Sequence, residues 1–214
     1  MTRVRLDHVS YAVSPGAFGS TLQRLGSALG ASFADGGVHP GFGTRNVVLP
    51  CVGGTYIEIV SPLDHPAVDR VPFGRAVKQK ADDGGGWLGW VVGVDSLEPI
   101  EARLGRDSVE GHRILPSGER LSWRQIGVLD LLRDPQLPFF VSWSADSLHP
   151  GEHSTTAIAV DTLEVAGSPE AVADWLGQPV DAALGPVAIE WVDSEDPGLV
   201  AVRFRTPNGI VRID

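Results

Sequence analysis

The chain has 214 residues, of which 43% are hydrophobic, and a formal net charge of -10. This composition suits one large or two small globular domains with ample material for a core. Because the acidic chain has no long lysine or arginine cluster, it argues against nucleic acid and against anionic membrane surfaces as partners, and small molecules and proteins remain.

The first part of the chain predicts a strand, a helix and two further strands. The strands are rich in β-branched residues and are bounded by turn residues. In the helix, Phe18, Leu22, Leu25 and Leu29 recur at helical spacing, and Gly30 follows as a C-terminal cap. The predicted elements are residues 6–13, 17–30, 44–50 and 55–61.

Two further units repeat this order of elements. The second follows a glycine-rich break, with strands at 87–94, 119–128 and 137–144 and a helix at 96–105. The third has strands at 155–167, 187–193, 200–204 and 208–214, and a helix at 168–177 that opens with Ser168 and Pro169. We therefore predict three divergent units, residues 1–80, 81–150 and 151–214.

Glu58 lies between two isoleucines in the stretch GGTYIEIVSP, residues 53–62. Side chains alternate between the two faces of a strand. If Ile57 and Ile59 face the core, Tyr56 and Glu58 face the other side, which is either solvent or a site.

The same alternation in neighbouring strands adds polar partners for Glu58. Val9, Tyr11 and Val13 form the expected core row of the first strand, so His8 and Ser10 point the opposite way. In the segment 44–50, Val47 and Leu49 face the core and leave Asn46 opposite. If these strands share one sheet with the helix behind it, five side chains converge on the uncovered face: His8, Ser10, Asn46, Tyr56 and Glu58.

An imidazole and a carboxylate on one wall allow two interpretations. They are ordinary ligands of a divalent metal, and His8 with Glu58 would supply half of a coordination shell. They could equally form a hydrogen-bonded pair that satisfies its own polar atoms. The spacing of the residues leaves both open.

The segments LDHVSYAV, HPGFGTRNVVLP and GGTYIEIVSP resemble the glyoxalase-like branch of the vicinal oxygen chelate superfamily, most specifically over residues 39–62. The resemblance implies an α+β fold in which tandem βαβββ modules form a curved, cup-like mixed sheet with helices on the outer face. Family enzymes hold a divalent metal with a His on the first strand and a Glu on the fourth, which His8 and Glu58 match. Two more ligands come from the partner module. The implied cofactor is a divalent transition metal: Zn, Mn, Fe, Co or Ni.

The later units depart from this ligand pattern. Strand 87–94 has no His or Gln, and strand 137–144 offers only Ser142. The third unit aligns Ala157 with His8 and Arg212 with Glu58. Arg212 could bind a substrate carboxylate or neutralise Glu58.

Other polar and aromatic residues carry weaker signals. Arg45 could bind an anion or pair with surface carboxylates, and Cys51, with no His near it in sequence, has no supported nucleophilic role. The histidines beside Pro or Gly are expected to be exposed and to have no functional role: His39, His65, His149 and His153. Four tryptophans of the second unit would either line an apolar pocket or belong to the core: Trp87, Trp90, Trp123 and Trp143.

These observations predict a metal-assisted lyase or isomerase that acts on a small oxygenated metabolite. His8 and Glu58 would hold the metal, and Glu58 or a bound hydroxide would move the proton. Residues expected to bind substrate are Ser10, Asn46, Tyr56, Arg45 and Arg212. The alternative is a metal-free protein that binds or sequesters a small molecule in the same cup, which the missing ligands and the tryptophans favour. Dimerisation through strand edges could accompany either function.

The N-terminal stretch MTRVRLDHVSYAV has no apolar signal region, and no run approaches the roughly 20 apolar residues of a membrane span. The single cysteine excludes an internal disulfide framework and a cysteine zinc site. We therefore expect a cytoplasmic protein.

Overall fold

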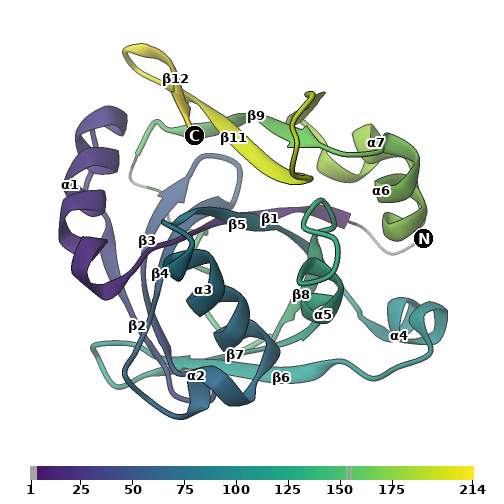
Figure 1. Cartoon of the computed structure of the whole chain (residues 1–214), viewed down its shortest axis with the longest axis horizontal. Helices are drawn as coiled ribbons and strands as arrows, with labels where there is room; N and C mark the ends of the chain where they lie inside the picture. The colour runs from purple at the N-terminus through teal and green to yellow at the C-terminus, as the bar shows by residue number, and fades with distance from the viewer. Residues whose placement is uncertain (1–3, 153, 155) are drawn as a thin grey trace.

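The computed structural model describes residues 4–152, 154 and 156–214, and within them eight strands close into a barrel (Figure 1). Their order around the barrel is β1-β4-β3-β2-β6-β7-β8-β5, with β1·β4 and β5·β8 parallel and the other pairs antiparallel. The strands are β1 (Val4–Ala12), β2 (Ala34–His39), β3 (Thr44–Cys51), β4 (Thr55–Pro62), β5 (Gly86–Val94), β6 (Val109–Ile114), β7 (Arg120–Ile126) and β8 (Phe139–Trp143). The first two units of the chain therefore share one sheet, and the expected α+β class with a curved mixed sheet is confirmed.

The strands of the first unit face the way that their alternation predicts. Val9, Tyr11, Ile57 and Ile59 belong to a core cluster outside the barrel. Helix α1 (Phe18–Leu29) adds Leu25 and Leu29 to this cluster and ends, as predicted, at Gly30, whose φ of 69° suits glycine. Because the apolar rows face outward under the helix, the polar rows of β1, β3 and β4 face the barrel interior.

Strands β2 and β6 were not predicted as elements. The sequence of β2, ADGGVH, contains two glycines, and that of β6, VEGHRI, carries charged residues, so neither shows a regular apolar alternation. Val38 of β2 pairs with Ile114 of β6, and this contact joins the two units at one side of the barrel. Cross-strand pairing, rather than the local apolar pattern, accounts for both strands.

Helix α3 (Pro72–Asp82) adds a feature that the resemblance does not imply. In the view of Figure 1 it lies within the ring of strands rather than outside it. Its apolar residues Phe73, Ala76 and Val77 belong to a second buried cluster that includes Val60 and Val91 from the barrel strands. The helix therefore covers the barrel interior. The remaining helices in this part of the chain are η1 (Pro15–Ala17), α2 (Ala67–Arg70), α4 (Glu98–Leu104) and α5 (Val128–Leu131).

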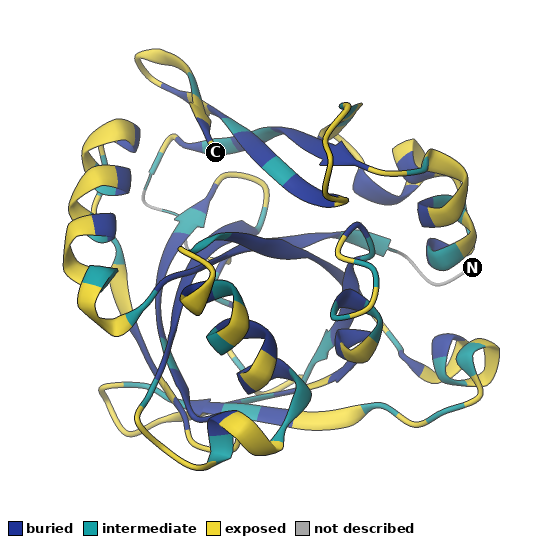
Figure 2. Cartoon of the chain, in the orientation of Figure 1, coloured by how far each residue is buried: buried dark blue, intermediate teal, exposed yellow. Residues whose placement is uncertain are grey.

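The C-terminal unit forms a separate sheet in the order β10-β9-β11-β12. Its elements are β9 (Ala159–Ala166), α6 (Pro169–Leu176), α7 (Val180–Leu184), β10 (Ala188–Trp191), β11 (Gly198–Thr206) and β12 (Gly209–Ile213). The sheet lies along the outside of the barrel next to β1 and β5, and the surfaces between them are largely buried (Figures 1 and 2). Leu163 and Phe204 of this sheet share the outer core cluster with Val9 and Trp90 of the barrel. The division of the chain at residues 80 and 150 stays a prediction.

No helix in the described ranges has the length and apolar character that crossing a bilayer requires.

Candidate functional site

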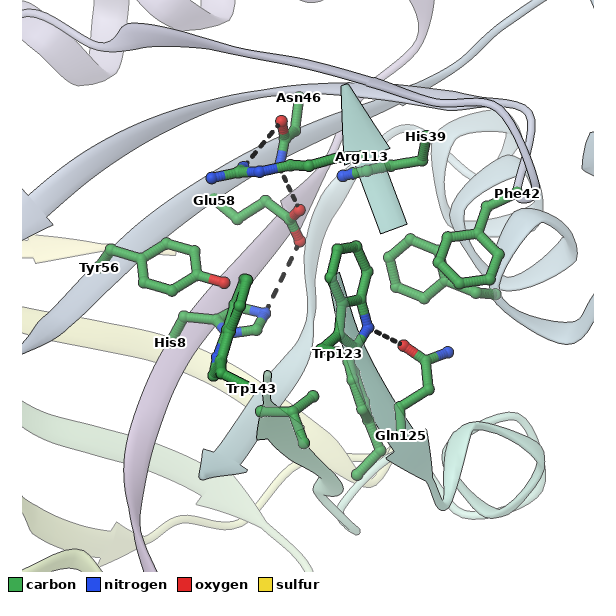
Figure 3. Close-up of a pocket in the computed structure, with 13 residues that line it drawn as sticks. His8, His39, Phe42, Asn46, Tyr56, Glu58, Arg113, Trp123, Gln125 and Trp143 are labelled. Atoms are coloured by element: carbon green, nitrogen blue, oxygen red, sulfur yellow. Dashed lines mark hydrogen bonds and ion pairs between the residues drawn. The ribbon is translucent and has the colours of Figure 1, made fainter. Parts of the chain in front are cut away.

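A cavity lies inside the barrel between the two halves of the sheet (Figure 3). Its empty volume is about 380 Å³, including the part open to solvent. Its polar lining consists of His8, His39, Asn46, Glu58, Arg113 and Gln125. Its apolar and aromatic lining consists mainly of Phe42, Phe73, Phe139, Val141, Trp123 and Trp143. Such a combination of apolar walls and a few polar groups is typical of small-molecule sites.

Glu58 is held by two donors from neighbouring strands. Ser10 Oγ donates to Oε2 over 2.6 Å, and Asn46 Nδ2 donates to Oε1 over 2.7 Å. Ser10 is the direct partner of Glu58 in the β1·β4 register, which explains the first contact. Burial raises the pKa of Glu58, but the charges of His8 and His39 and the two hydrogen bonds together lower it below 4.5. Glu58 is therefore a carboxylate at neutral pH.

His8 is oriented by the residue that precedes it. Asp7 Oδ1 lies 2.7 Å from Nδ1 of His8, while the other ring nitrogen, Nε2, lies 3.9 Å from Glu58 Oε2. The imidazole stacks on the ring of Tyr56, with a distance of 4.4 Å between ring centroids. Because Asp7 holds a proton on Nδ1, Nε2 is left facing the cavity and Glu58.

Asp7 accepts hydrogen bonds from three side chains and is 0% exposed. Besides His8, its partners are His149 Nε2 at 3.0 Å and Trp143 Nε1 at 3.2 Å. Burial raises the pKa of Asp7, but the hydrogen bonds from His149 and His8 and their charges lower it well below its ordinary value. His149 Nδ1 accepts from the backbone N–H of Gly151, so the proton toward Asp7 lies on Nε2. One ionised carboxylate therefore fixes both imidazoles.

The structure brings together the five side chains that alternation placed on one face. His8, Asn46, Tyr56 and Glu58 line the cavity, and Ser10 reaches it through its bond to Glu58. Burial and the nearby carboxylates of Asp7 and Glu58 raise the pKa of the Tyr56 hydroxyl well above 10, so this group stays protonated. The roles of these residues in binding or catalysis stay predictions.

Two arginines expected to bind substrate lie away from the cavity. Arg45 follows Thr44 on β3 and points to the opposite face from Asn46, where it is half-exposed over the ring of Phe18 and 4.0 Å from Asp35. Arg212 lies on β12 of the C-terminal sheet, which is not part of the barrel, and its guanidinium bonds Glu164 through Nε and Nη2. Arg212 therefore neither contacts Glu58 nor reaches a ligand in this cavity.

Two histidines expected to be exposed and silent are buried. His39 ends β2 and lines the cavity, with Nδ1 2.8 Å from Thr44 Oγ1, and burial lowers its pKa to about 4. His149 is the partner of Asp7. Both corrections have the same cause, since a loop-like local sequence does not reveal which segments the fold covers. His65 is exposed as expected, and His153 lies outside the described residues.

The tryptophans divide between the two roles considered for them. Trp123 and Trp143 line the cavity, whereas Trp87 and Trp90 belong to the outer core cluster. Trp87 Nε1 donates to the carbonyl of Ile213, which ties the barrel to the C-terminal sheet.

Sequence reasoning missed Arg113 and Asp7. Arg113 lies on β6, a strand that was not predicted, and it is 3% exposed. Asp7 precedes a histidine on a predicted strand, and a charged residue at the sequence spacing of the apolar Val9 and Tyr11 was the signal that could have identified it.

A groove lined by residues of α3, β6, β7 and α5 adjoins the cavity. It has an empty volume of about 940 Å³ and shares Phe42, Phe73 and Gln125 with the cavity lining. These three side chains therefore lie between the two spaces.

The cavity does not supply the donor set of the metal that the family resemblance implies. His8 and Glu58 are the two expected ligands of the first module, and β8 of the partner module presents Phe139, Val141 and Trp143 to the cavity. Within the described ranges, no three His, Cys, Asp or Glu side chains are grouped so that they could hold a metal ion. His8 and Glu58 opposite the apolar side chains of β8 do not supply the protein ligands that a divalent metal needs.

Comparisons with known proteins agree with the fold. The family described as a glyoxalase-like domain matches residues 6–180, whereas no curated protein matches the chain. A hypothetical protein from Staphylococcus aureus superposes with a TM-score of 0.70 at 13% identity, over 99% of each chain.

Weaker superpositions involve methylmalonyl-CoA epimerases. The Mycobacterium tuberculosis enzyme gives a TM-score of 0.42 at 16% identity over 65% of this chain and 86% of its own. A variant of the Streptomyces coelicolor enzyme, in complex with 2-nitronate-propionyl-CoA, gives 0.44 at 16% identity over 70% of this chain and 100% of its own. These scores are too low to inform the function.

Proposed function

Because the chain belongs to the glyoxalase-like domain family of the vicinal oxygen chelate superfamily, we propose that it is an isomerase- or lyase-type enzyme that moves a proton on a small oxygenated metabolite. The observation that carries the proposal is that His8 and Glu58 face one cavity while Asp7, buried behind His8, holds the imidazole. Glu58 would act as the base, and His8 would exchange a proton with a substrate oxygen.

The distance between His8 and Glu58 supports this assignment. At 3.9 Å, His8 Nε2 and Glu58 Oε2 are too far apart to satisfy each other by a hydrogen bond. Nε2 of His8 can therefore bond a ligand, and Oε2 of Glu58, which accepts from Ser10 Oγ, keeps a lone pair for one. Two such atoms facing the same space could contact the carbon and the oxygen between which a proton moves.

The neighbours of the pair prepare it for proton transfer. Ser10 and Asn46 fix the carboxylate of Glu58, and Asp7 fixes the ring of His8. These contacts are made before substrate arrives, so little reorganisation would be needed during the reaction. The buried cavity would also exclude bulk water from the reacting groups.

Many proteins of the superfamily use divalent metals. In the metal-assisted form of the proposed reaction, His8 and Glu58 would bind Zn, Mn, Fe, Co or Ni. The donor set of the cavity does not support it, so we assign the proton transfer to the side chains themselves. Elemental analysis of protein purified without chelator tests this point. Near-stoichiometric metal in the wild type that disappears in Glu58→Gln would establish the metal-assisted form instead.

A second candidate is a metal-free binding protein. The aromatic wall formed by Trp123, Trp143 and Phe139 favours it, because such a surface can bind an apolar ligand without chemistry. Saturable quenching of tryptophan fluorescence by a compound that the protein does not alter would support this function.

The test is exchange of substrate hydrogen in D2O, followed by NMR with a panel of small 2-oxo and 2-hydroxy compounds in the presence of chelator. We expect the wild type to catalyse exchange with at least one compound and Glu58→Gln to lose about 100-fold or more of the rate. Glu119→Gln, which changes an exposed carboxylate between β6 and β7, is the matched control. Equal exchange by wild type and Glu58→Gln would refute the assignment.

A further inference from the structure

Arg113 is a buried cation without a counter-ion among the residues that the structure describes. It is 3% exposed and extends across the cavity above Glu58 (Figure 3). Nη1 of Arg113 donates a long hydrogen bond of 3.3 Å to Asn46 Oδ1. Its Nε has no hydrogen-bond partner in the described part of the chain. Within the described ranges, the ion pairs at up to 4.0 Å do not include Arg113, although they include Arg106, Arg203 and Arg212.

Such an arrangement is costly for the ligand-free protein. A guanidinium stays protonated at all ordinary pH values, so burial cannot be relieved by loss of the charge. Buried charges in proteins are normally paired and hydrogen-bonded. The unpaired state of Arg113 is therefore expected at a site that receives an anion.

Asn46 keeps Arg113 separate from the nearest carboxylate in the cavity. Its amide donates to Glu58 through Nδ2 and accepts from Arg113 through Oδ1. Glu58 is thus fixed by neutral donors while the guanidinium remains available. Gly36 leaves room for this pair, because a Cβ there would lie 2.2 Å from Asn46 Oδ1 and 2.9 Å from Arg113 Nη1.

The remaining walls define what accompanies the negative charge. Phe42, Phe73, Phe139 and Trp123 surround the space below the arginine. The empty volume is about 380 Å³ even with the part open to solvent included, so the cavity calls for a compact ligand. One cation among aromatic rings matches a single carboxylate on a compact apolar body.

We propose that the cavity binds a small monocarboxylate with an apolar or aromatic body and that Arg113 holds its carboxylate through the guanidinium. The bound acid would place the carbon next to its carboxylate beside His8 and Glu58. This last point rests on the proposed proton-transfer function, whereas binding of the acid does not.

The test compares acids with their uncharged amides. Binding of phenylacetate, phenylacetamide and phenyl phosphate is measured by quenching of tryptophan fluorescence and by calorimetry, and acetate with acetamide forms a smaller pair. We expect phenylacetate to bind about 10-fold or more tightly than phenylacetamide or phenyl phosphate, a difference of about 1.4 kcal/mol. Arg113→Met should abolish this preference, and Arg113→Lys should retain part of it.

Two controls separate this proposal from general damage and from the proposed function. Arg120→Gln removes an exposed arginine from the same β6–β7 hairpin and should keep the preference. Glu58→Gln, which removes a negative charge from the cavity, should bind phenylacetate at least as tightly as the wild type while losing proton exchange, so that loss of catalysis and loss of binding are distinguishable. An enzyme without any exchange activity can still pass the binding test.

The thermal midpoint of the ligand-free protein gives a second readout. Removing an unpaired buried charge should leave the midpoint of Arg113→Met unchanged or raise it, whereas loss of a structural arginine would lower it. The proposal is wrong if neither acid is preferred over its amide, if phenyl phosphate binds more tightly than phenylacetate, or if the ligand-free Arg113→Met protein is strongly destabilised.

Discussion

His149 Nε2 lies 3.0 Å from Asp7 Oδ2, although 142 positions separate the two residues in the chain. Through this contact the segment after β8 is attached to the first strand of the barrel, directly behind His8. The same carboxylate accepts from His8 and Trp143, so one buried group supports both the fold and the cavity.

Asp7→Asn is therefore expected to lower the free energy of unfolding by about 3 kcal/mol or more, because one amide oxygen replaces a carboxylate that accepts from three buried donors. Proton exchange should fall as well, since the ring of His8 is no longer held. Urea denaturation measures the first effect. Asp95→Asn, which alters a surface pair with Arg5, should cost less than about 1 kcal/mol. Similar effects for the two variants would contradict this account of Asp7.

His39 should make the protein less stable in mild acid. Its pKa is about 4 in the folded state against an ordinary value of 6.5, because burial disfavours its charged form. As pH falls below 6.5, the unfolded chain takes up a proton that the folded chain does not take up until about pH 4, so stability is lost across this window. At about 1.4 kcal/mol per pH unit the loss amounts to about 3 kcal/mol.

The check on His39 is urea denaturation at pH 7 and pH 4.5. His39→Gln retains a polar group for Thr44 but does not titrate, so its stability should fall less over this range than that of the wild type. Equal losses in the two proteins would mean that His39 does not contribute.

Gly36→Ala is predicted to disturb the cavity without unfolding the barrel. The new Cβ would meet the ends of the Asn46 and Arg113 side chains, which can move, rather than backbone atoms. Affinity for phenylacetate should therefore drop about 10-fold or more, which corresponds to about 1.4 kcal/mol. In Gly19→Ala an added Cβ meets nothing within 4 Å on helix α1. The Gly19→Ala variant should keep its affinity for phenylacetate and gain about 1 kcal/mol of stability. Unchanged binding of phenylacetate by Gly36→Ala would count against the Asn46–Arg113 arrangement.

Glu164 should matter for the C-terminal sheet and not for the cavity. It is buried and pairs with Arg212 and Arg203, and the hydrogen bonds from Arg212 are the main cause that lowers its pKa. Glu164→Gln should therefore cost about 2 kcal/mol in denaturation experiments at pH 7. The cost should shrink as pH falls below 4.5, because protonation of Glu164 in the wild type removes the charge that the two arginines pair with. Affinity for phenylacetate should stay the same, and a parallel loss of affinity would place this sheet in the site after all.

The local pattern of β1, β3 and β4 was enough to predict which side chains share the inner face of the first module. Side-chain direction in a strand is set by the backbone itself, so His8, Asn46 and Glu58 could be grouped without a structure. The helix over residues 17–30 could be predicted for a similar reason, because its apolar spacing and its terminal glycine are local signals.

Strands β2 and β6 could not be predicted in this way. Each is stabilised by pairing with a strand distant in sequence, and Val38 with Ile114 closes the barrel only once both modules are present. Arg113 was missed because β6, the strand that carries it, was not predicted. Arg212 was expected in the cavity but lies on the separate C-terminal sheet, because a repeated order of elements does not say which units share a sheet.

The sequence alone thus determined the α+β class, the glyoxalase-like resemblance and one polar wall with Glu58 at its centre. Tertiary structure alone decided that the second module closes the barrel, that Asp7 lies between two imidazoles, and that Arg113, among the described residues, lies unpaired opposite an aromatic wall. The physical reason is that alternation and helical spacing depend on neighbouring residues, whereas burial and ion pairing depend on contacts that only the closed barrel creates.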